Sequence, residues 1–305
     1  MRRLIAGVVT EDEALAELRR VQLEELSGRA RLDLGRYLRR GIPEVVLAPG
    51  KSPDEAARLA VVMAEQHGQG LVSRMTDAHR AALEAAAAGM RLVSYHSSAR
   101  VMRPGFAPEP LDAKVGLMTA GTSDVAVADE ARMVVEACGL EARLEADLGV
   151  AGLHRFVGPL SAMLEWGADV LVVAAGMDGV LPGLVAGLVD VPVIGLPVST
   201  GYGRGGAGEG ALTTMLQSCS TGLVVVNIDN GVGAGAAAVL IAQRRGRNTA
   251  ATANTSAPRM SRPKTAAAMT REMSAPPGRA KTNAKITTVA KTPASSHGKP
   301  RRRRP

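Results

Sequence analysis

Segments with the patterns of strands and of helices alternate through residues 112–245, and this alternation restricts the fold more than any other feature of the chain. Apolar strands are expected at residues 115–118, 142–145, 170–174, 193–197 and 223–228. Helices are expected at residues 125–137, 155–165, 181–188, 210–218 and 232–243. Such alternation is typical of a parallel sheet that helices cover on both faces. We therefore predict an α/β fold built on a three-layer parallel sheet, with ligands at the carboxyl ends of its strands.

The first 111 residues predict a smaller α+β domain. Helices are expected from Thr10, where Glu13 completes a capping box, from Ser52 to about residue 66, and over residues 76–88. Short strands are expected at residues 44–48, 70–73 and 91–95. Residues 102–110 (MRPGFAPEP) contain three prolines and are typical of a linker, so we place a domain boundary near residue 111 and a second domain at 112–245.

The basic residues of the chain are concentrated in its tail. Residues 246–305 contain 14 Lys and Arg and one acidic residue, whereas residues 1–245 contain 23 basic and 28 acidic residues, a net charge of −5. The tail consists mainly of Ala, Thr, Ser, Pro, Lys and Arg without a helix or strand period, so we predict that residues 246–305 are disordered. Its four final arginines could contact polyanions weakly, or the tail could be no more than a solvated end.

Composition argues against several classes of protein. The two cysteines, Cys138 and Cys219, are too few for a disulfide scaffold or a four-thiolate metal site. Aromatic residues make up 2% of the chain, which argues against a stacking platform for single-stranded nucleic acid. No apolar run approaches the roughly 20 residues of a membrane span. The basic start runs directly into the acidic residues 11–13, unlike a signal peptide, so we expect a cytoplasmic protein without membrane contact.

The loop TAGTSD, residues 119–124, directly follows a predicted strand. Gly121 lets the backbone approach a ligand, and the hydroxyls of Thr122 and Ser123 lie at the start of a helix. Together with Asp124 these residues could bind an anion, because a helix N-terminus presents unpaired N–H groups. An ordinary helix cap requires the same residues, so both interpretations stay open.

Two further loops carry groups that could act on a ligand. The loop GVAGLHR ends in His154, a possible acid or base, and Arg155, a possible clamp for phosphate or carboxylate. A single His is more often structural. In the loop AAGMDGVLPG, Asp178 follows Gly176 at the end of a predicted strand. A carboxylate between glycines is a good site candidate, and the alternative is a helix cap.

The stretch GYGRGGAGEG, residues 201–210, contains six glycines in ten residues, which are costly to order. With Tyr202 and Gly203 at its start, it favours a mobile loop that closes over a ligand, and a plain connection is the alternative.

Cys219 lies in the loop SCSTG and is expected beside the other loops. It could be a nucleophile if a nearby cation or base activates it. Cys138 lies on an apolar helix face and is expected to be buried and inert.

These five loops, in this order, resemble the LarB family of nickel-pincer cofactor synthesis proteins. The matching stretches are TAGTSDVAVADEA, DLGVAGLHR, AGMDGVLPGLVAGLVDVPVIGLPVSTGYG, SCSTG and VNIDNGVGAGAAA. The first half resembles the N-terminal signature of that family in LDLGRYLRRGIPEVVLAPGKSPDE, through Asp33, Arg36, Gly41, Pro43, Glu44, Gly50 and Lys51. The resemblance covers about residues 30–240. The second half also resembles the flavodoxin-like AIR carboxylase fold of purine synthesis, whose site lies between subunits.

The resemblance implies a carboxylase that acts on nicotinic acid adenine dinucleotide with carbon dioxide or bicarbonate. It would also cleave the phosphoanhydride, which gives pyridinium-3,5-biscarboxylic acid mononucleotide and AMP. Cys219 matches the position of the nucleophile, whose thiolate would add to the pyridinium ring. Asp178 and His154 are the other candidate catalytic residues. The candidate substrate-binding residues are Gly121, Thr122, Ser123, Asp124, Arg155, Gly176, Tyr202, Gly203 and Lys51.

The same resemblance implies a homo-oligomer, an octamer by analogy with AIR carboxylases. The small residues of the segment GVGAGAAA, 231–238, would permit close approach of subunits. No tightly bound cofactor is expected, because no His, Asp and Glu cluster has the spacing of metal ligands. A divalent ion that assists anhydride cleavage would be Mg²⁺ held largely by phosphate oxygens.

The chain departs from the family pattern at two places, and two other functions stay open. Asp178 stands where the family usually has Glu, which shortens its reach, and the residues after Gly203 are smaller than is usual. One alternative is an AIR carboxylase or mutase, which needs neither an active-site Cys nor the N-terminal domain. The other is a regulatory ligand sensor whose basic tail binds nucleic acid, and the acidic body and the few aromatics count against it.

Overall fold

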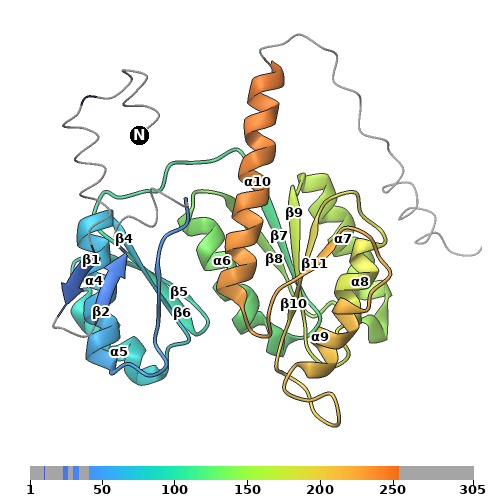
Figure 1. Cartoon of the computed structure of the whole chain (residues 1–305), viewed down its shortest axis with the longest axis horizontal. Coiled ribbons are helices and arrows are strands. Elements are labelled where there is room, and N and C mark those ends of the chain that lie inside the picture. The colour runs from blue at the N-terminus through green and yellow to red at the C-terminus, as the bar shows by residue number, and fades with distance from the viewer. Residues whose placement is uncertain (1–9, 11–22, 27–29, 34–40, 254–305) are drawn as a thin grey trace, which may run out of the picture.

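The computed structural model describes Thr10, residues 23–26 and 30–33, and residues 41–253. Within this part of the chain the strands form one two-stranded pair and two larger sheets (Figure 1). The pair joins β1 (Leu23–Leu26) antiparallel to β2 (Ala30–Asp33). The helix predicted from Thr10, Arg36 of the family signature and residues 254–305 of the tail predicted to be disordered lie outside the described residues.

A five-stranded parallel sheet forms the centre of the second half. Its order is β11-β10-β9-β7-β8, and all neighbouring strands are parallel. The strands are β7 (Lys114–Thr119), β8 (Glu141–Glu145), β9 (Val170–Ala175), β10 (Val193–Pro197) and β11 (Leu223–Val225). The helices are α6 (Val125–Ala137), α7 (His154–Trp166), α8 (Val180–Ala186), α9 (Glu209–Leu216) and α10 (Gly231–Ala253). The predicted α/β fold with a parallel sheet is confirmed, although β11 is shorter than predicted.

Alternate side chains of this sheet face two different layers of helices. Leu117, Val172 and Ile194 belong to a core that includes residues of α6 and α10. Leu171 and Val173 belong to a second core with residues of α7, α8 and α9. Because successive side chains of a strand point to opposite faces, the nearly continuous apolar runs of β9 and β10 bury both faces of the sheet. The sheet is therefore the middle of three layers (Figure 1).

The N-terminal sheet has four strands in the order β3-β4-β6-β5. These are β3 (Val45–Leu47), β4 (Gln69–Ser73), β5 (Arg91–Tyr95) and β6 (Ser98–Met102), with helices α4 (Pro53–His67) and α5 (Asp77–Ala86). Strands β3 and β4 are parallel, and β6 is antiparallel to both of its neighbours. Helix α4 begins at the predicted cap, where the hydroxyl of Ser52 accepts a hydrogen bond from the backbone N–H of Glu55. Helix α5 is capped in the same way by Thr76, whose hydroxyl accepts from the N–H of His79; the sequence predicted a helix here but not this cap.

The sequence pattern does not predict strand β6, because a charged residue interrupts its apolar run. Arg100 is buried in its centre, where Nε donates to Oε1 of Gln69 at 2.7 Å and Nη1 donates to the carbonyl of Glu136 at 3.3 Å. Burial lowers the pKa of Arg100. Burial also raises the pKa of Tyr95, so the phenol stays protonated and donates to Oε2 of Glu136 at 2.6 Å. These contacts fix the N-terminal sheet against α6.

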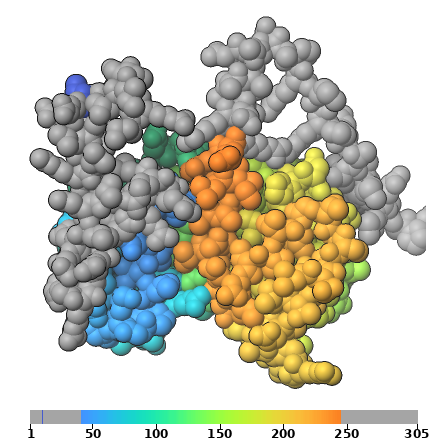
Figure 2. All heavy atoms as spheres, viewed as in Figure 1, coloured from blue at the N-terminus to red at the C-terminus, as the bar shows by residue number. Residues whose placement is uncertain are grey.

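Helix α10 extends further than the sequence predicts. It ends at Ala253, so residues 246–253 are helical although they belong to the segment predicted to be disordered. The helix can continue because the first proline of the tail is Pro258. In Figure 2, α10 (orange) lies at the surface between the N-terminal part (blue) and the loops of the second half (yellow). Neither α10 nor any other described helix combines the length and apolar character needed to cross a membrane.

Glycines at the start of α10 allow it to lie directly against α6. A Cβ atom added to Gly231 would be 2.3 Å from the carbonyl oxygen of Val127, and one added to Gly235 would be 2.6 Å from that of Ala131. Both distances are far below van der Waals contact. The sequence suggests that these small residues meet another subunit; the structure instead uses these two glycines in packing within one chain.

We expect Gly235→Ala to lower the free energy of unfolding by about 1–3 kcal/mol, because α10 must move away from α6 to admit the methyl group. Gly158→Ala is the matched control: in α7, an added Cβ meets no atom within 4 Å. Since Ala favours helices, the control should keep its stability or gain up to about 1 kcal/mol. Urea unfolding of the two variants measures the difference. Wild-type stability in Gly235→Ala would contradict the close packing of the two helices.

Candidate functional site

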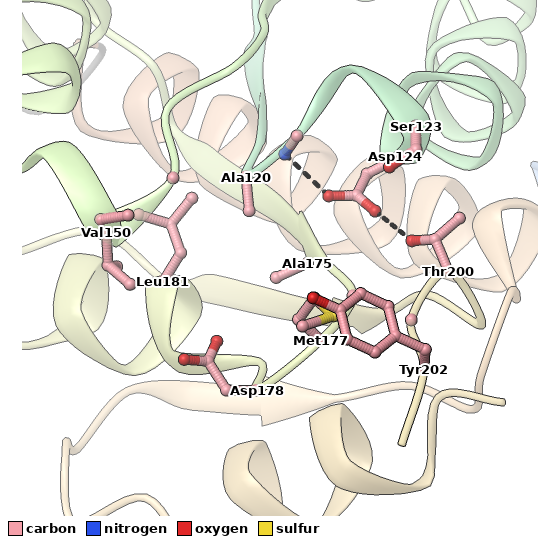
Figure 3. Close-up of a pocket in the computed structure, with 15 residues that line it drawn as sticks. Ala120, Ser123, Asp124, Val150, Ala175, Met177, Asp178, Leu181, Thr200 and Tyr202 are labelled. Carbon is pink, nitrogen blue, oxygen red and sulfur yellow. Dashed lines mark hydrogen bonds between the residues drawn. The ribbon is translucent and has the colours of Figure 1, made fainter. Parts of the chain in front are cut away.

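Four of the predicted loops meet at the carboxyl edge of the five-stranded sheet, after β7, β8, β9 and β10. They enclose a hollow of about 570 Å³, which we call the carboxyl-edge pocket (Figure 3). Its described lining consists of Ala120, Gly121, Ser123, Asp124, Gly149, Val150, Ala151, Ala175, Gly176, Met177, Asp178, Leu181, Thr200, Gly201 and Tyr202. This is the position at which parallel α/β sheets bind ligands.

Asp124 is fixed at one side of the pocket by hydrogen bonds to two loops. Its side chain is buried; Oδ2 accepts from the N–H of Gly121 at 2.9 Å, and Oδ1 accepts from the hydroxyl of Thr200 at 2.6 Å (Figure 3). Thr122 begins the same turn but is exposed and does not line the pocket. Asp124 therefore joins the loops after β7 and β10. Thr200 was missed in the sequence; its signal was a hydroxyl directly before the glycine-rich stretch.

The loop after β9 approaches its neighbour closely. A Cβ atom added to Gly176 would be 2.1 Å from the carbonyl oxygen of Thr200, and this carbonyl accepts from the N–H of Met177 at 3.0 Å. Asp178 follows and lies across the pocket from Asp124 in Figure 3. Its exposed carboxylate accepts a long bond of 3.4 Å from the next helix. An exposed carboxylate with a weak local partner can take a proton from a bound ligand.

Tyr202 projects from the loop after β10 at the rim of the pocket. The residue is 82% exposed, and Figure 3 shows its ring at the edge of the pocket. The next residue, Gly203, adopts a φ of 78° and is exposed, but does not line the pocket. The stretch runs on to α9 at Glu209. An exposed ring on a glycine-rich loop could cover a bound ligand, and the closing motion stays a prediction.

The basic residues predicted for the site lie outside the pocket lining in this single chain. His154 is exposed at the start of α7. Arg155 is paired, with Nη1 2.9 Å from Oδ2 of Asp147. Lys51 belongs to the N-terminal part, where Nζ donates to the carbonyl of Leu47 at 3.0 Å. The described lining thus contains two carboxylates and no Lys, Arg or His.

Cys219 also lies outside this pocket. The loop 218–222 connects α9 to β11, and in a parallel sheet a helix-to-strand loop lies at the amino end of the strand it enters. The expectation that all five loops gather at the carboxyl ends was therefore wrong for this loop. The exposed thiol lines a second hollow, of about 580 Å³, which we call the Cys219 groove. Its described lining is Gly179, Val180, Gly183, Leu184, Thr213, Thr214, Gln217, Ser218, Cys219 and Ser220.

The Cys219 groove begins next to the carboxyl-edge pocket. Gly179 and Val180 line the groove, and Asp178, directly before them, lines the pocket. The loop of Cys219 is held to α8 by the hydroxyl of Ser220, which donates to the carbonyl of Gly183 at 2.7 Å. The two hollows are therefore neighbours along α8.

The second cysteine has the opposite environment. Cys138 is buried at the end of α6, where its thiol donates to the carbonyl of Gly41 at 3.6 Å. Burial raises the pKa of the Cys138 thiol to about 12, so it stays protonated. The prediction that Cys138 is buried is confirmed. Within the described residues no group of three or more His, Cys, Asp or Glu could hold a metal ion.

Comparisons with known proteins identify both halves of the chain. Residues 23–104 match the model of the LarB/PurE-like N-terminal domain, and residues 114–262 match the model of AIR carboxylase. An uncharacterized protein of Methanocaldococcus jannaschii is 38% identical over 249 residues, which cover 78% of this chain and 93% of that protein. The chain belongs to the LarB family.

A second relative of this LarB-family protein matches less of it. The N5-carboxyaminoimidazole ribonucleotide mutase of Thermotoga maritima is 27% identical over 131 residues, which cover 42% of this chain and 74% of the mutase. The resemblance to LarB proteins with an AIR carboxylase-like C-terminal domain is thus confirmed. The domains are those of carboxylase- or mutase-type enzymes.

Proposed function

We propose that this LarB-family protein carboxylates the pyridinium ring of nicotinic acid adenine dinucleotide and cleaves its phosphoanhydride with water. The products would be pyridinium-3,5-biscarboxylic acid mononucleotide and AMP, in the first step of nickel-pincer cofactor synthesis. One observation carries the proposal: an AIR carboxylase-like domain, joined to a LarB-type N-terminal domain, presents an exposed thiol in a groove next to its pocket. An AIR carboxylase or mutase needs neither an active-site thiol nor the N-terminal domain, and this is the second candidate function.

In the proposed reaction, the thiol of Cys219 makes the pyridinium ring able to react with carbon dioxide. A pyridinium ring is electron-poor and does not attack carbon dioxide. When the thiolate of Cys219 forms a bond to a ring carbon, the ring becomes a dihydropyridine, an enamine with a nucleophilic carbon. That carbon forms a bond to carbon dioxide. A base then removes its proton, and the thiolate leaves with its bonding electrons, which restores the aromatic ring.

Asp178 is the better placed of the two candidate bases. It lines the carboxyl-edge pocket and directly precedes the residues that begin the Cys219 groove. His154 is exposed at the start of α7 and does not line the pocket. A carboxylate can accept the ring proton if the ligand lies within hydrogen-bond reach of it.

Binding of the dinucleotide in the pocket requires positive charge from groups outside the described lining. The dinucleotide carries two phosphates and a carboxylate, whereas the described lining offers two carboxylates and no basic side chain. Like charges at close range are unfavourable unless cations separate them. We extend the proposal to a homo-oligomer in which a neighbouring copy completes each site, with an octamer as the analogy to AIR carboxylases suggests. Arg155, Lys51 or a Mg²⁺ ion on the phosphates would add to this charge.

Light scattering tests the assembly. We expect a particle of several copies of the 31.5 kDa chain at micromolar concentration. The two carboxylates and the lack of a basic side chain in the described lining make the pocket of one chain a poor site for an anionic substrate, and a second copy can supply the opposing charge. A monomer under these conditions would contradict the shared site and leave the charge of the pocket unbalanced.

Incubation with nicotinic acid adenine dinucleotide and bicarbonate tests the reaction. We expect release of AMP together with a mononucleotide that has gained one carboxylate, identified by mass spectrometry. AMP without the carboxylated product would reduce the proposal to anhydride hydrolysis. No AMP, together with turnover of N5-carboxyaminoimidazole ribonucleotide, would favour the mutase alternative.

A further inference from the structure

The N-terminal sheet reaches the carboxyl-edge pocket through a series of hydrogen bonds that begins at Arg74. This residue directly follows β4. Its Nε donates to Oε1 of Glu130 at 3.3 Å, and its Nη2 donates to the backbone carbonyl of Asp229. Glu130 lies on α6, and Asp229 lies in the loop before α10. One side chain therefore joins the N-terminal sheet to two elements of the second half.

Asp229 continues the series into the loop after β10. Its Oδ1 accepts from the N–H of Ser199 at 2.8 Å. The next residue is Thr200, whose hydroxyl donates to Asp124 at 2.6 Å and whose carbonyl accepts from Met177 at 3.0 Å. Thr200, Asp124 and Met177 all line the pocket. Arg74 is thus separated from the pocket lining by the two residues Asp229 and Ser199.

The backbone at both ends of this link is unusual. Arg74 has a φ of 57° and Asp229 a φ of 54°, in the left-handed region. Asp adopts this region fairly readily, but a long side chain such as Arg does so rarely. Such conformations persist where surrounding contacts fix them. Here the buried Glu130 accepts from Arg74 and Ser73 and, through Oε2, from the N–H of Val232 at 3.1 Å.

We propose that Arg74 is a positioning residue for the carboxyl-edge pocket. By holding the carbonyl of Asp229, it places the carboxylate that binds Ser199, and so sets the position of Thr200 against Asp124. The N-terminal domain then has a part in the site although Arg74 does not line the pocket. The consequence for turnover rests on the proposed function; the consequence for the loop after β10 does not.

Hydrogen–deuterium exchange of the full-length protein tests the link without any substrate. In Arg74→Ala, the backbone amides of residues 198–203 should exchange faster, on the order of 10-fold, because Asp229 loses one of the hydrogen bonds that position its carboxylate. The matched control is Arg80→Ala. Arg80 contacts Ser94 and the carbonyl of His96 within the N-terminal part. Its removal should leave exchange at residues 198–203 unchanged.

Loss of Arg74 leaves the buried Glu130 with one donor fewer, so a second variant guards against misfolding. Arg74→Ala combined with Glu130→Gln removes the buried charge, and it should show the same faster exchange at residues 198–203. In the carboxylation assay we expect kcat to fall on the order of 10-fold for Arg74→Ala and to stay at the wild-type value for Arg80→Ala. Exchange at residues 198–203 equal to wild type in both Arg74 variants would overturn the proposal, whether or not the dinucleotide is the substrate.

Discussion

Replacement of Cys219 by Ser should lower the rate of carboxylation by several orders of magnitude and leave binding of the dinucleotide nearly unchanged. The thiolate is the proposed nucleophile, and a serine hydroxyl is far harder to ionise than a thiol. Binding should survive because the substitution is small and Cys219 does not line the carboxyl-edge pocket. Single-turnover formation of the carboxylated product measures the first effect, and calorimetric titration measures the second.

The second cysteine supplies the control for this substitution. Cys138→Ser should keep the wild-type rate, because this thiol is buried and lines neither hollow. The substitution should lower the free energy of unfolding by about 1–3 kcal/mol, since burying a hydroxyl costs more free energy than burying a thiol. In the wild type, we expect mass spectrometry to detect a thiol–dihydropyridine adduct when carbon dioxide is withheld. Full activity in Cys219→Ser would remove covalent catalysis, and the AIR carboxylase alternative would then become the better proposal.

The fold could be predicted from the sequence where local pattern and burial agree. Strands β9 and β10 are continuous apolar runs, and the predicted cap at Ser52 marks the start of α4 by the hydrogen bond that the structure contains. Strand β6 could not be predicted, because Arg100 is acceptable in a buried strand only when distant residues accept from its guanidinium. Those acceptors, on β4 and α6, come together only in the folded chain.

The site residues divide in the same way, into those that a local sequence pattern predicts and those that depend on contacts between distant parts of the chain. Gly121, Asp124, Gly176 and Asp178 were predicted to belong to the site because each lies in a loop directly after a strand, and all four line the pocket. The bond between Thr200 and Asp124 joins residues 76 positions apart, and no local pattern predicts it.

For Cys219, the order of helices and strands would have been enough to predict its position correctly. A loop that follows a helix and precedes a parallel strand lies at the amino edge of the sheet. The prediction placed every unusual loop at the carboxyl ends of the strands, although the loop of Cys219 follows a helix rather than a strand. Topology, not residue type, decides which loops share an edge of the sheet.

Two inactive variants should regain activity when they are assembled together. Asp124→Ala removes the hydrogen bonds that join two loops of the pocket, and Cys219→Ser removes the nucleophile, so each homo-oligomer should be inactive. If the thiol of one copy serves the pocket of its neighbour, random mixing restores about a quarter of the sites. Co-expression with two different affinity tags isolates the mixed oligomers, and mixed tags on two Cys219→Ser chains are the control.

This outcome decides between two geometries that the two hollows allow. If Cys219 serves the pocket of its own chain, a site in the mixed oligomer always lacks either its thiol or its pocket, and no activity returns. The ligand would then have to extend along α8 from Asp178, past Gly179 and Val180, into the Cys219 groove. Recovery near a quarter of the wild-type rate would instead mean that the groove faces a neighbouring pocket. The same interface could then supply the positive charge that the described pocket lining lacks.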